Sequence, residues 1–134
     1  MTGFAMRVAD AAQGMVGAPF RLHGRDPATG LDCLGLVAAS IAAAGREPPQ
    51  LPGYTLRNLS IARFLGLLTE LGLERVDGPE RPGDILLARP AAGQHHLAIA
   101  SRGGGFVHAH AGLGRVVESP APLPWPIAGR WRFT

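Results

Sequence analysis

The stretch Gly30-Leu31-Asp32-Cys33-Leu34-Gly35-Leu36-Val37, continued to Gly45, decides the fold. Its residues 33, 36, 37, 40, 41 and 44 follow helical spacing, so they share one face of a helix. Asp32 is suited to the N-cap, and Gly45 is suited to the C-terminal stop. The sequence therefore predicts a helix that begins at Cys33, the single cysteine of the chain.

The spacing of apolar residues in the rest of the chain is helical before Pro82 and alternates after it. On the N-terminal side, apolar spacing predicts a helix over residues 4–16, followed by a polar loop over 21–30. On the C-terminal side, a further helix is expected from about 59 to 71. After Pro82 the pattern alternates, which predicts strands at 83–88, 96–101, 105–110, 114–119 and 129–133, with an irregular segment at 120–126. Helices followed by antiparallel strands define an α+β plan.

Length and composition narrow the class of protein. A chain of 134 residues with 46% hydrophobic and 17% charged residues fits one domain, residues 1–134, with a real core. One cysteine excludes an internal disulfide and any multi-cysteine metal site. No apolar run reaches 18 residues, so no membrane span is expected. The start of the sequence lacks the pattern of a secretory signal, which predicts synthesis in the cytoplasm.

The basic residues do not point to nucleic acid. All 13 are arginines, the net charge is +3, and the arginines are scattered along the chain. Nucleic-acid binders usually cluster such residues on one element, often with aromatic side chains. We therefore expect no nucleic-acid partner.

Cys33 is the candidate nucleophile. A cysteine in the first turn of a helix is near unpaired backbone N–H groups and the positive end of the helix dipole, which lower the pKa of its thiol. The rest of its helix face is apolar, so the helix is expected to pack on the sheet with the sulfur at the rim. The alternative is a small, buried, inert cysteine.

A cysteine hydrolase also needs a base, and four histidines fall within sixteen residues of the predicted hairpin. If its loop has three residues, even-numbered positions face each other across the ladder. His96 then lies opposite or diagonal to His108 or His110, within reach of a ring–ring hydrogen bond. A two-residue loop would place His96 across from Ala111 instead.

Metal binding is the competing interpretation of the histidines. His108 and His110, with His96 or His95, could bind a divalent cation. No carboxylate lies in the hairpin between Asp84 and Glu118, and no partner that would orient a metal-bound imidazole is evident. We therefore expect neither a metal nor another cofactor.

Several segments resemble, in order, those of NlpC-type cell-wall peptidases. The resemblance covers roughly residues 11–119 and rests on Gly17-Ala-Pro19-Phe20-Arg21, on residues 30–37, on Arg81-Pro-Gly83-Asp84-Ile85-Leu86, on residues 95–100 and on residues 105–109. It implies a papain-like fold, with a cysteine-bearing helix packed on an antiparallel sheet. It also implies cleavage of amide bonds in peptidoglycan stem peptides, often between D-glutamate and a diamino acid.

Carried over by position, the resemblance makes Cys33 the nucleophile, His96 the general base and His108 the residue that orients the base. Asp32, Leu34 and Phe20 are the candidate substrate-binding residues, although Asp32 is expected to act mainly as the helix cap. Two positions depart from the family pattern. Leu34 stands where serine is common, and Phe20 stands where a tyrosine hydroxyl can assist near the oxyanion. The departures concern substrate recognition and oxyanion stabilisation.

The length, and the absence of an evident targeting or wall-binding module, are similar to those of compact members encoded with phage tails and gene-transfer particles. This resemblance implies peptidoglycan peptides as substrates, phage-like tail proteins as partners and action at the cell wall. Two other functions remain open: a non-catalytic structural tail component with the same fold, and an interbacterial amidase toxin with the same chemistry.

Overall fold

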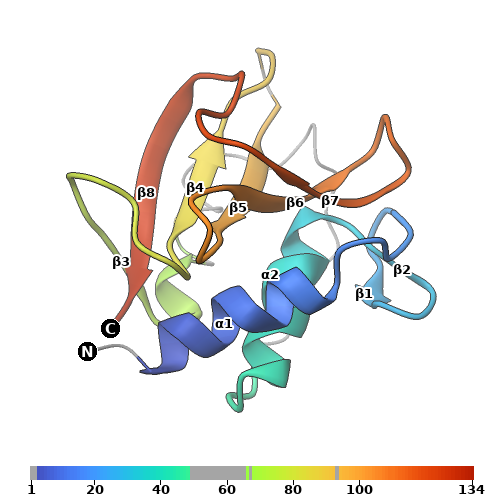
Figure 1. The fold of residues 1–134 in the computed structure, drawn as a ribbon, viewed down its shortest axis with the longest axis horizontal. Helices are drawn as coiled ribbons and strands as arrows, with labels where there is room; N and C mark the ends of the chain where they lie inside the picture. Colours follow the sequence, from blue (N-terminus) through green and yellow to red (C-terminus); the bar gives the residue numbers. More distant parts are fainter. Residues whose placement is uncertain (1–2, 49–65, 67, 93) are drawn as a thin grey trace.

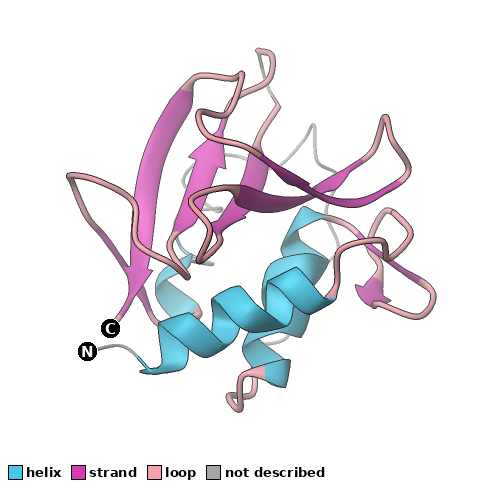
Figure 2. Ribbon diagram, viewed as in Figure 1, coloured by secondary structure: helices cyan, strands magenta, loops and turns pink. Residues whose placement is uncertain are grey.

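The computed structural model describes residues 3–48, 66, 68–92 and 94–134. Two helices, α1 (Gly3–Gly14) and α2 (Cys33–Ala43), lie side by side against one face of a sheet (Figures 1 and 2). The helix predicted from Cys33 is confirmed, including its cap: the Asp32 side chain accepts a hydrogen bond from the Gly35 N–H. The first helix ends two residues earlier than expected.

The main sheet has six strands in the order β3-β8-β4-β5-β6-β7, and every neighbouring pair is antiparallel. The bounds are β3 (Leu73–Arg75), β4 (Ile85–Ala88), β5 (His96–Ala100), β6 (Phe106–His110), β7 (Arg115–Ser119) and β8 (Ile127–Phe133). The five strands predicted after Pro82 are present, and the segment between β7 and β8 is irregular, as expected. The α+β, papain-like architecture is confirmed.

Each face of the sheet has its own apolar cluster. Odd-numbered side chains of β4, β5 and β6 pack against the helices in the larger cluster, among them Leu87, Leu97 and Val107. Even-numbered side chains face the other way and meet Leu123 and Trp125 of the irregular segment. Alternation along a strand produces this division, and it places the even-numbered histidines on the face away from the helices.

Helix α2 lies at the centre of the molecule. Its residues Cys33 to Ala38 are all buried, as are Ser40 and Ile41, so it is enclosed on more than one side. A helix that is apolar on all sides is expected in such a position. It packs against α1, against β5 and β6, and against the segment that precedes it.

Two expectations need correction. Residues 21–30 are not wholly a loop, because β1 (Arg25–Asp26) and β2 (Gly30–Leu31) form a small antiparallel pair. Strand β3 was not predicted, since three residues are too short to show alternation. The helix expected at 59–71 lies mostly outside the described residues. Within this range, residues 66 and 68–70 are described and are helical. No helix in the described part of the chain is long and apolar enough to span a membrane.

Candidate active site

The β5–β6 hairpin brings two imidazoles together. Its register pairs Ile99 with Val107 and Ala100 with Phe106, so even-numbered residues face each other, as the three-residue loop requires. His96 and His108 are therefore diagonal neighbours on one face. Nε2 of His96 lies 2.8 Å from Nδ1 of His108, which confirms the ring–ring contact predicted from the spacing.

A second contact extends this pair. Nε2 of His108 lies 2.8 Å from Oγ of Ser119, at the end of β7. The His108 side chain is buried, and the Trp125 ring meets both imidazoles edge to face, with centroids 5.2 Å from His96 and 5.7 Å from His108. The three side chains thus form a line of hydrogen-bonding groups, with an indole beside the two rings.

Cys33 begins α2 but does not lie at the rim. Its side chain is 1% exposed and belongs to the cluster between the helices and the sheet. The expectation of a sulfur at the edge of the helix is therefore wrong. The helix is deeper than its sequence indicates because the segment before it also covers its start.

The thiol nevertheless lies next to the first residue of β5. The backbone N–H of Leu97 hydrogen-bonds to the sulfur and lowers the pKa of the thiol. This N–H belongs to the peptide that joins His96 to Leu97. His96 is the first residue of β5, a strand that packs against α2. The thiol of Cys33 therefore lies beside the backbone of the His96–Leu97 peptide, although 63 positions separate Cys33 from His96 in the sequence.

Burial sets the charge state of the two groups. Desolvation, followed by the negative charge of Asp32, raises the pKa of Cys33 to about 12. Hydrogen bonds from the backbone N–H groups of Leu97, Leu34 and Cys33 lower the pKa of the thiol, but their effect is smaller than that of desolvation. Desolvation also lowers the pKa of His96 to about 3, with further contributions from His108 and His110. Both pKa shifts favour the uncharged form of the group, so the thiol of Cys33 and the imidazole of His96 are neutral. The low thiol pKa expected at a helix start is therefore wrong.

Asp32 holds the start of the nucleophile helix in place. Its carboxylate accepts hydrogen bonds from the backbone N–H groups of Gly35 and His23, at 2.7 and 2.8 Å, and from the Arg25 guanidinium at 3.1 Å. The side chain is fully buried, so it offers no surface to a ligand. The structure thus places Asp32 as the cap and as a clamp on the preceding loop.

Two glycines allow this loop to reach the helix. A Cβ at Gly35 would lie 1.8 Å from the Gly24 carbonyl oxygen, and a Cβ at Gly24 would lie 2.1 Å from the Gly30 carbonyl oxygen. The glycine two positions after the nucleophile is therefore needed for close backbone contact. Of the other candidate binding residues, Leu34 is buried beside the cysteine, and Phe20 is partly exposed on the segment that pairs with Leu31.

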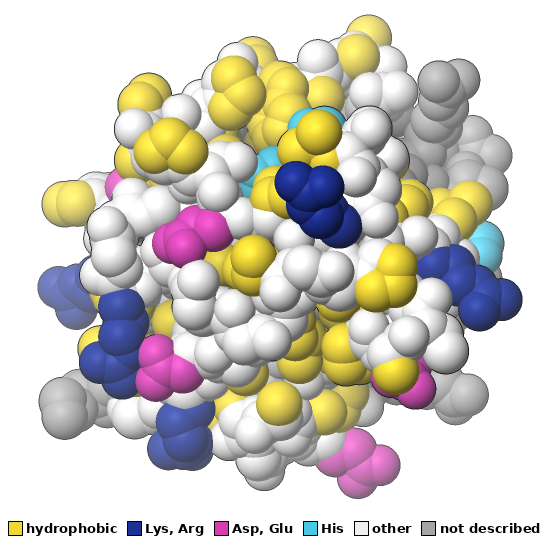
Figure 3. Space-filling model, turned by 45° about the vertical axis from the view of Figure 1, so that its right-hand side comes forward, with side chains coloured by type: hydrophobic (Ala, Val, Ile, Leu, Met, Phe, Trp, Pro, Cys, Tyr) yellow, Lys and Arg dark blue, Asp and Glu magenta, His cyan; other side chains and the backbone are white. Residues whose placement is uncertain are grey.

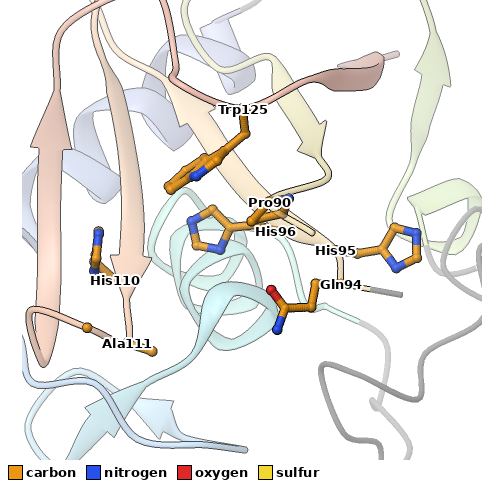
Figure 4. A pocket seen from close by; sticks show the side chains of 8 residues that line it. Pro90, Gln94, His95, His96, His110, Ala111 and Trp125 are labelled. Carbon is orange, nitrogen blue, oxygen red and sulfur yellow. The ribbon is translucent and has the colours of Figure 1, made fainter. Parts of the chain in front are cut away.

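A pocket of about 410 Å³ opens beside His96 (Figure 4). It is lined by Pro90, Gln94, His95, His96, His110, Ala111, Gly112 and Trp125. Figure 4 shows Trp125 above His96 and His110 on the opposite side of the opening. Neither carboxylates nor arginines are among these lining residues, and Cys33, which is buried in the core, is not one of them.

The surface agrees with the scattered arginines of the sequence. On the face shown in Figure 3, arginine side chains lie at the left edge, near the centre and at the right edge, and histidine atoms reach the surface next to hydrophobic side chains. No broad basic patch is seen on this face.

The imidazole nitrogens are directed at protein groups. Nε2 of His96 and both nitrogens of His108 have the contacts described above, and Nδ1 of His110 accepts a hydrogen bond from the Leu113 N–H. Within the described residues, no group of three or more His, Cys, Asp or Glu side chains is arranged to hold a metal ion.

Sequence reasoning missed two residues of this site. Ser119 was assigned only to a strand, although its parity places it on the face of His108 once β7 pairs with β6. Trp125 was assigned only to the irregular segment at 120–126. It lies in an irregular segment, so no periodicity could place it beside the histidines.

A cysteine at the start of a central helix, packed against an antiparallel sheet that carries a histidine pair, is a papain-like arrangement. The chain matches the NlpC/P60 family over residues 17–125 and belongs to that family. Members of this family are generally cysteine peptidases that act on peptidoglycan. The chain therefore belongs to a family of cell-wall hydrolases.

Solved structures share the fold. The P60 domain of an antigen from M. avium subspecies paratuberculosis is 21% identical, with a TM-score of 0.68, and the match covers 99% of this chain and 97% of that one. The NlpC/p60 domain of the peptidoglycan hydrolase SagA is 23% identical, with a TM-score of 0.62 and coverage of 92% and 95%.

NlpC1 from Trichomonas vaginalis is 17% identical, with a TM-score of 0.70, and the match covers 96% of this chain. The chain spans only 44% of that protein. Among curated proteins, none matches the chain.

Proposed function

We propose that the protein is a cysteine hydrolase with Cys33 as nucleophile, His96 as general base and acid, and His108 as the residue that orients His96. The observation that carries the proposal is the 2.8 Å contact between Nε2 of His96 and Nδ1 of His108. That contact leaves Nδ1 of His96 for the thiol, which lies against the next peptide of the same strand. Membership in a family of cysteine peptidases supports the assignment.

Acylation starts from the neutral pair. Nδ1 of His96 takes the thiol proton as the sulfur attacks the scissile carbonyl carbon, so a C–S bond forms while the carbonyl π electrons move to oxygen. Backbone N–H groups at the start of α2 are the candidate oxyanion donors. They include those of Cys33 and Leu34, which also lower the pKa of the thiol.

Collapse of the tetrahedral intermediate breaks the C–N bond, and the His96 imidazolium protonates the leaving amine. Water then attacks the thioester with His96 as base, the C–S bond breaks, and the thiol is restored. The imidazolium forms only during turnover, where His108 accepts its Nε2–H. The thiol is 1% exposed, so the proposal requires substrate binding to open a path to Cys33.

The pocket beside His96 supports a peptide substrate. Trp125 and Pro90 supply apolar walls, while Gln94 and His110 supply hydrogen-bonding groups at its edge. The bond we propose is the amide between D-glutamate and a diamino acid in a peptidoglycan stem peptide, as the family resemblance suggests. Phe20 and Leu34, which depart from the family pattern, are proposed to shape the oxyanion side of the site without donating a hydrogen bond.

Delivery to the cell wall as part of a phage-like particle is proposed on the resemblance to compact phage-tail members alone. Co-purification of the chain with particles from the source would support it. Recovery of the chain only outside particles would contradict it.

Digestion of a panel of defined muropeptides, followed by mass spectrometry, tests the activity and identifies the bond. The expected result is one cleaved amide with the wild-type chain and none with Cys33→Ala or His96→Gln. Cleavage by Cys33→Ala at the wild-type rate would overturn the assignment of the nucleophile. Cleavage at another amide would correct the substrate alone.

One observation favours a second function. The buried thiol with its raised pKa is also what a retained, inactive scaffold would show. In that case the chain is a structural component with a papain-like fold. A folded wild-type chain that cleaves neither muropeptides nor whole sacculi would support this alternative.

A further inference from the structure

Ser119 extends the histidine pair at the His108 end, away from the pocket beside His96. Its Oγ lies 2.8 Å from Nε2 of His108, while Nδ1 of the same ring lies 2.8 Å from Nε2 of His96. The sheet register explains the contact: His108 pairs with Val117, and Ser119 is two residues further along the same face of β7. The three polar groups therefore run across three adjacent strands.

The direction of the proton in this line decides whether His96 can act as a base. A neutral imidazole carries one N–H, and the other nitrogen accepts. If His96 carries its proton on Nε2, its Nδ1 is free to take the thiol proton, and Nδ1 of His108 must accept. His108 must then carry its own proton on Nε2 and donate it to Ser119.

The reverse direction blocks the reaction. If Ser119 donates to Nε2 of His108, then His108 donates from Nδ1 to His96, and the remaining proton of His96 lies on Nδ1. That nitrogen cannot accept a proton from Cys33. An acceptor at the far end of the line therefore controls the basic nitrogen of His96, which lies two hydrogen bonds away.

Burial gives Ser119 this influence. The His108 side chain is 1% exposed and has Trp125 packed against its ring. A buried N–H without an acceptor is costly, so an acceptor that faces Nε2 favours the tautomer with the proton on that nitrogen. Among the described side chains, Ser119 is the hydrogen-bond partner of that nitrogen.

We propose that Ser119 is a positioning residue: its Oγ accepts from Nε2–H of His108, which keeps Nδ1 of His108 an acceptor for His96 and leaves Nδ1 of His96 free for the thiol. This inference rests on the proposed function of Cys33 and His96. Ser119 touches neither substrate nor sulfur, and it acts through the two imidazoles.

The test reads the tautomers directly. In ¹⁵N-histidine-labelled protein without ligand, two-bond ¹H–¹⁵N correlation spectra should show both His96 and His108 protonated on Nε2. Ser119→Ala should add an Nδ1–H population at His108. Ser119→Thr, which keeps the hydroxyl, and Ser119→Asp, which can only accept, should retain the Nε2–H form. Ser101→Ala is the matched control, because its hydroxyl bonds Glu118 rather than a histidine.

Kinetics on a cleavable muropeptide provides the second readout. Ser119→Ala should lower kcat by about tenfold or more with little change in KM, a part of the ~10²–10⁴-fold that a positioned base contributes. Ser119→Thr should restore most of it. Ser101→Ala should leave kcat within about twofold, since no transition-state contact is lost.

Three results would overturn the proposal: Nδ1–H on His108 in the wild type, unchanged tautomers in Ser119→Ala, or equal loss of kcat in the alanine and threonine variants. Failure of the proposed function is distinguishable. A folded chain with the Nε2–H tautomers but no cleavage of any muropeptide would reject the hydrolase and retain the role of Ser119 in fixing the rings.

Discussion

Nε2 of His96 lies 2.8 Å from Nδ1 of His108, and desolvation is the main cause that lowers the pKa of both imidazoles, to about 3 and about 4. Positive charge on either ring is disfavoured because the rings are buried and close to each other and to His110. The pair is thus held neutral across the physiological range. A base of this kind is charged only during the reaction.

The stability of the fold should fall in acid because of these two rings. In the unfolded chain both titrate near the ordinary value of 6.5, so below that pH the unfolded state binds more protons than the folded state. The free energy of unfolding should be constant between about pH 7 and 8 and should decline from about 6.5 towards 4, by up to about 1.4 kcal/mol per pH unit for each histidine. Urea denaturation at several pH values measures the slope.

His108→Gln should reduce that slope, because one of the two buried imidazoles is lost. An equal slope in wild type and His108→Gln would contradict the buried neutral pair.

Alkylation of the single cysteine should behave as that of a buried thiol. The pKa of Cys33 is raised from 9.0 to about 12, so the rate with iodoacetamide should be low at pH 7 and should increase about tenfold per pH unit up to pH 9, as the thiolate fraction does. Unfolding in urea should accelerate it at neutral pH. A rate plateau extending from pH 4 to 8, as a thiolate–imidazolium pair produces, would show that the resting site is charged.

Replacement of Asp32 should affect both stability and the thiol. Asp32→Asn removes the charge that raises the pKa of Cys33, so that pKa should decrease. It also weakens the hydrogen bonds from His23 and Arg25, and the free energy of unfolding should decrease by about 1–3 kcal/mol. Asp77→Asn, at an exposed position, is the control for the loss of one charge. A thiol pKa that rises in Asp32→Asn would refute this assignment.

Gly35 should not tolerate a side chain. In Gly35→Ala the new Cβ would meet the Gly24 carbonyl at 1.8 Å, so the helix start or the loop must move, at a cost of about 3 kcal/mol or more. Gly14→Ala is the matched control, because a Cβ there meets nothing within 4 Å and helix propensity favours alanine by about 1 kcal/mol. Thermal denaturation compares the two, and a smaller loss in Gly35→Ala than in Gly14→Ala would contradict the close contact.

Local signals in the sequence were sufficient to predict α2 and the β5–β6 hairpin, which carry most residues of the candidate site. The Asp32 cap and the helical spacing after it predict α2. The strand parity predicts the contact between His96 and His108 on the condition that the hairpin loop has three residues, and the observed register meets that condition. These features depend on neighbouring residues or on a single hairpin. The resemblance to NlpC-type peptidases supplied the choice of His108 over His110.

Other features depend on packing that a single sequence does not encode locally. The depth of Cys33 results from covering by α1 and by the preceding segment, and it reverses the expected direction of the thiol pKa shift. Ser119 becomes visible only after β7 is paired with β6. Trp125 reaches the histidines from a segment without periodicity.

The central claim is that Cys33 attacks the substrate with His96 as its base. Rapid acid quenching during muropeptide turnover, followed by intact mass measurement and peptide mapping, tests it most directly. The account predicts a mass increase equal to the acyl half of the substrate, located on Cys33 and absent in His96→Gln. Turnover by the wild-type chain that persists unchanged in Cys33→Ala, with no acyl group on residue 33, would contradict it.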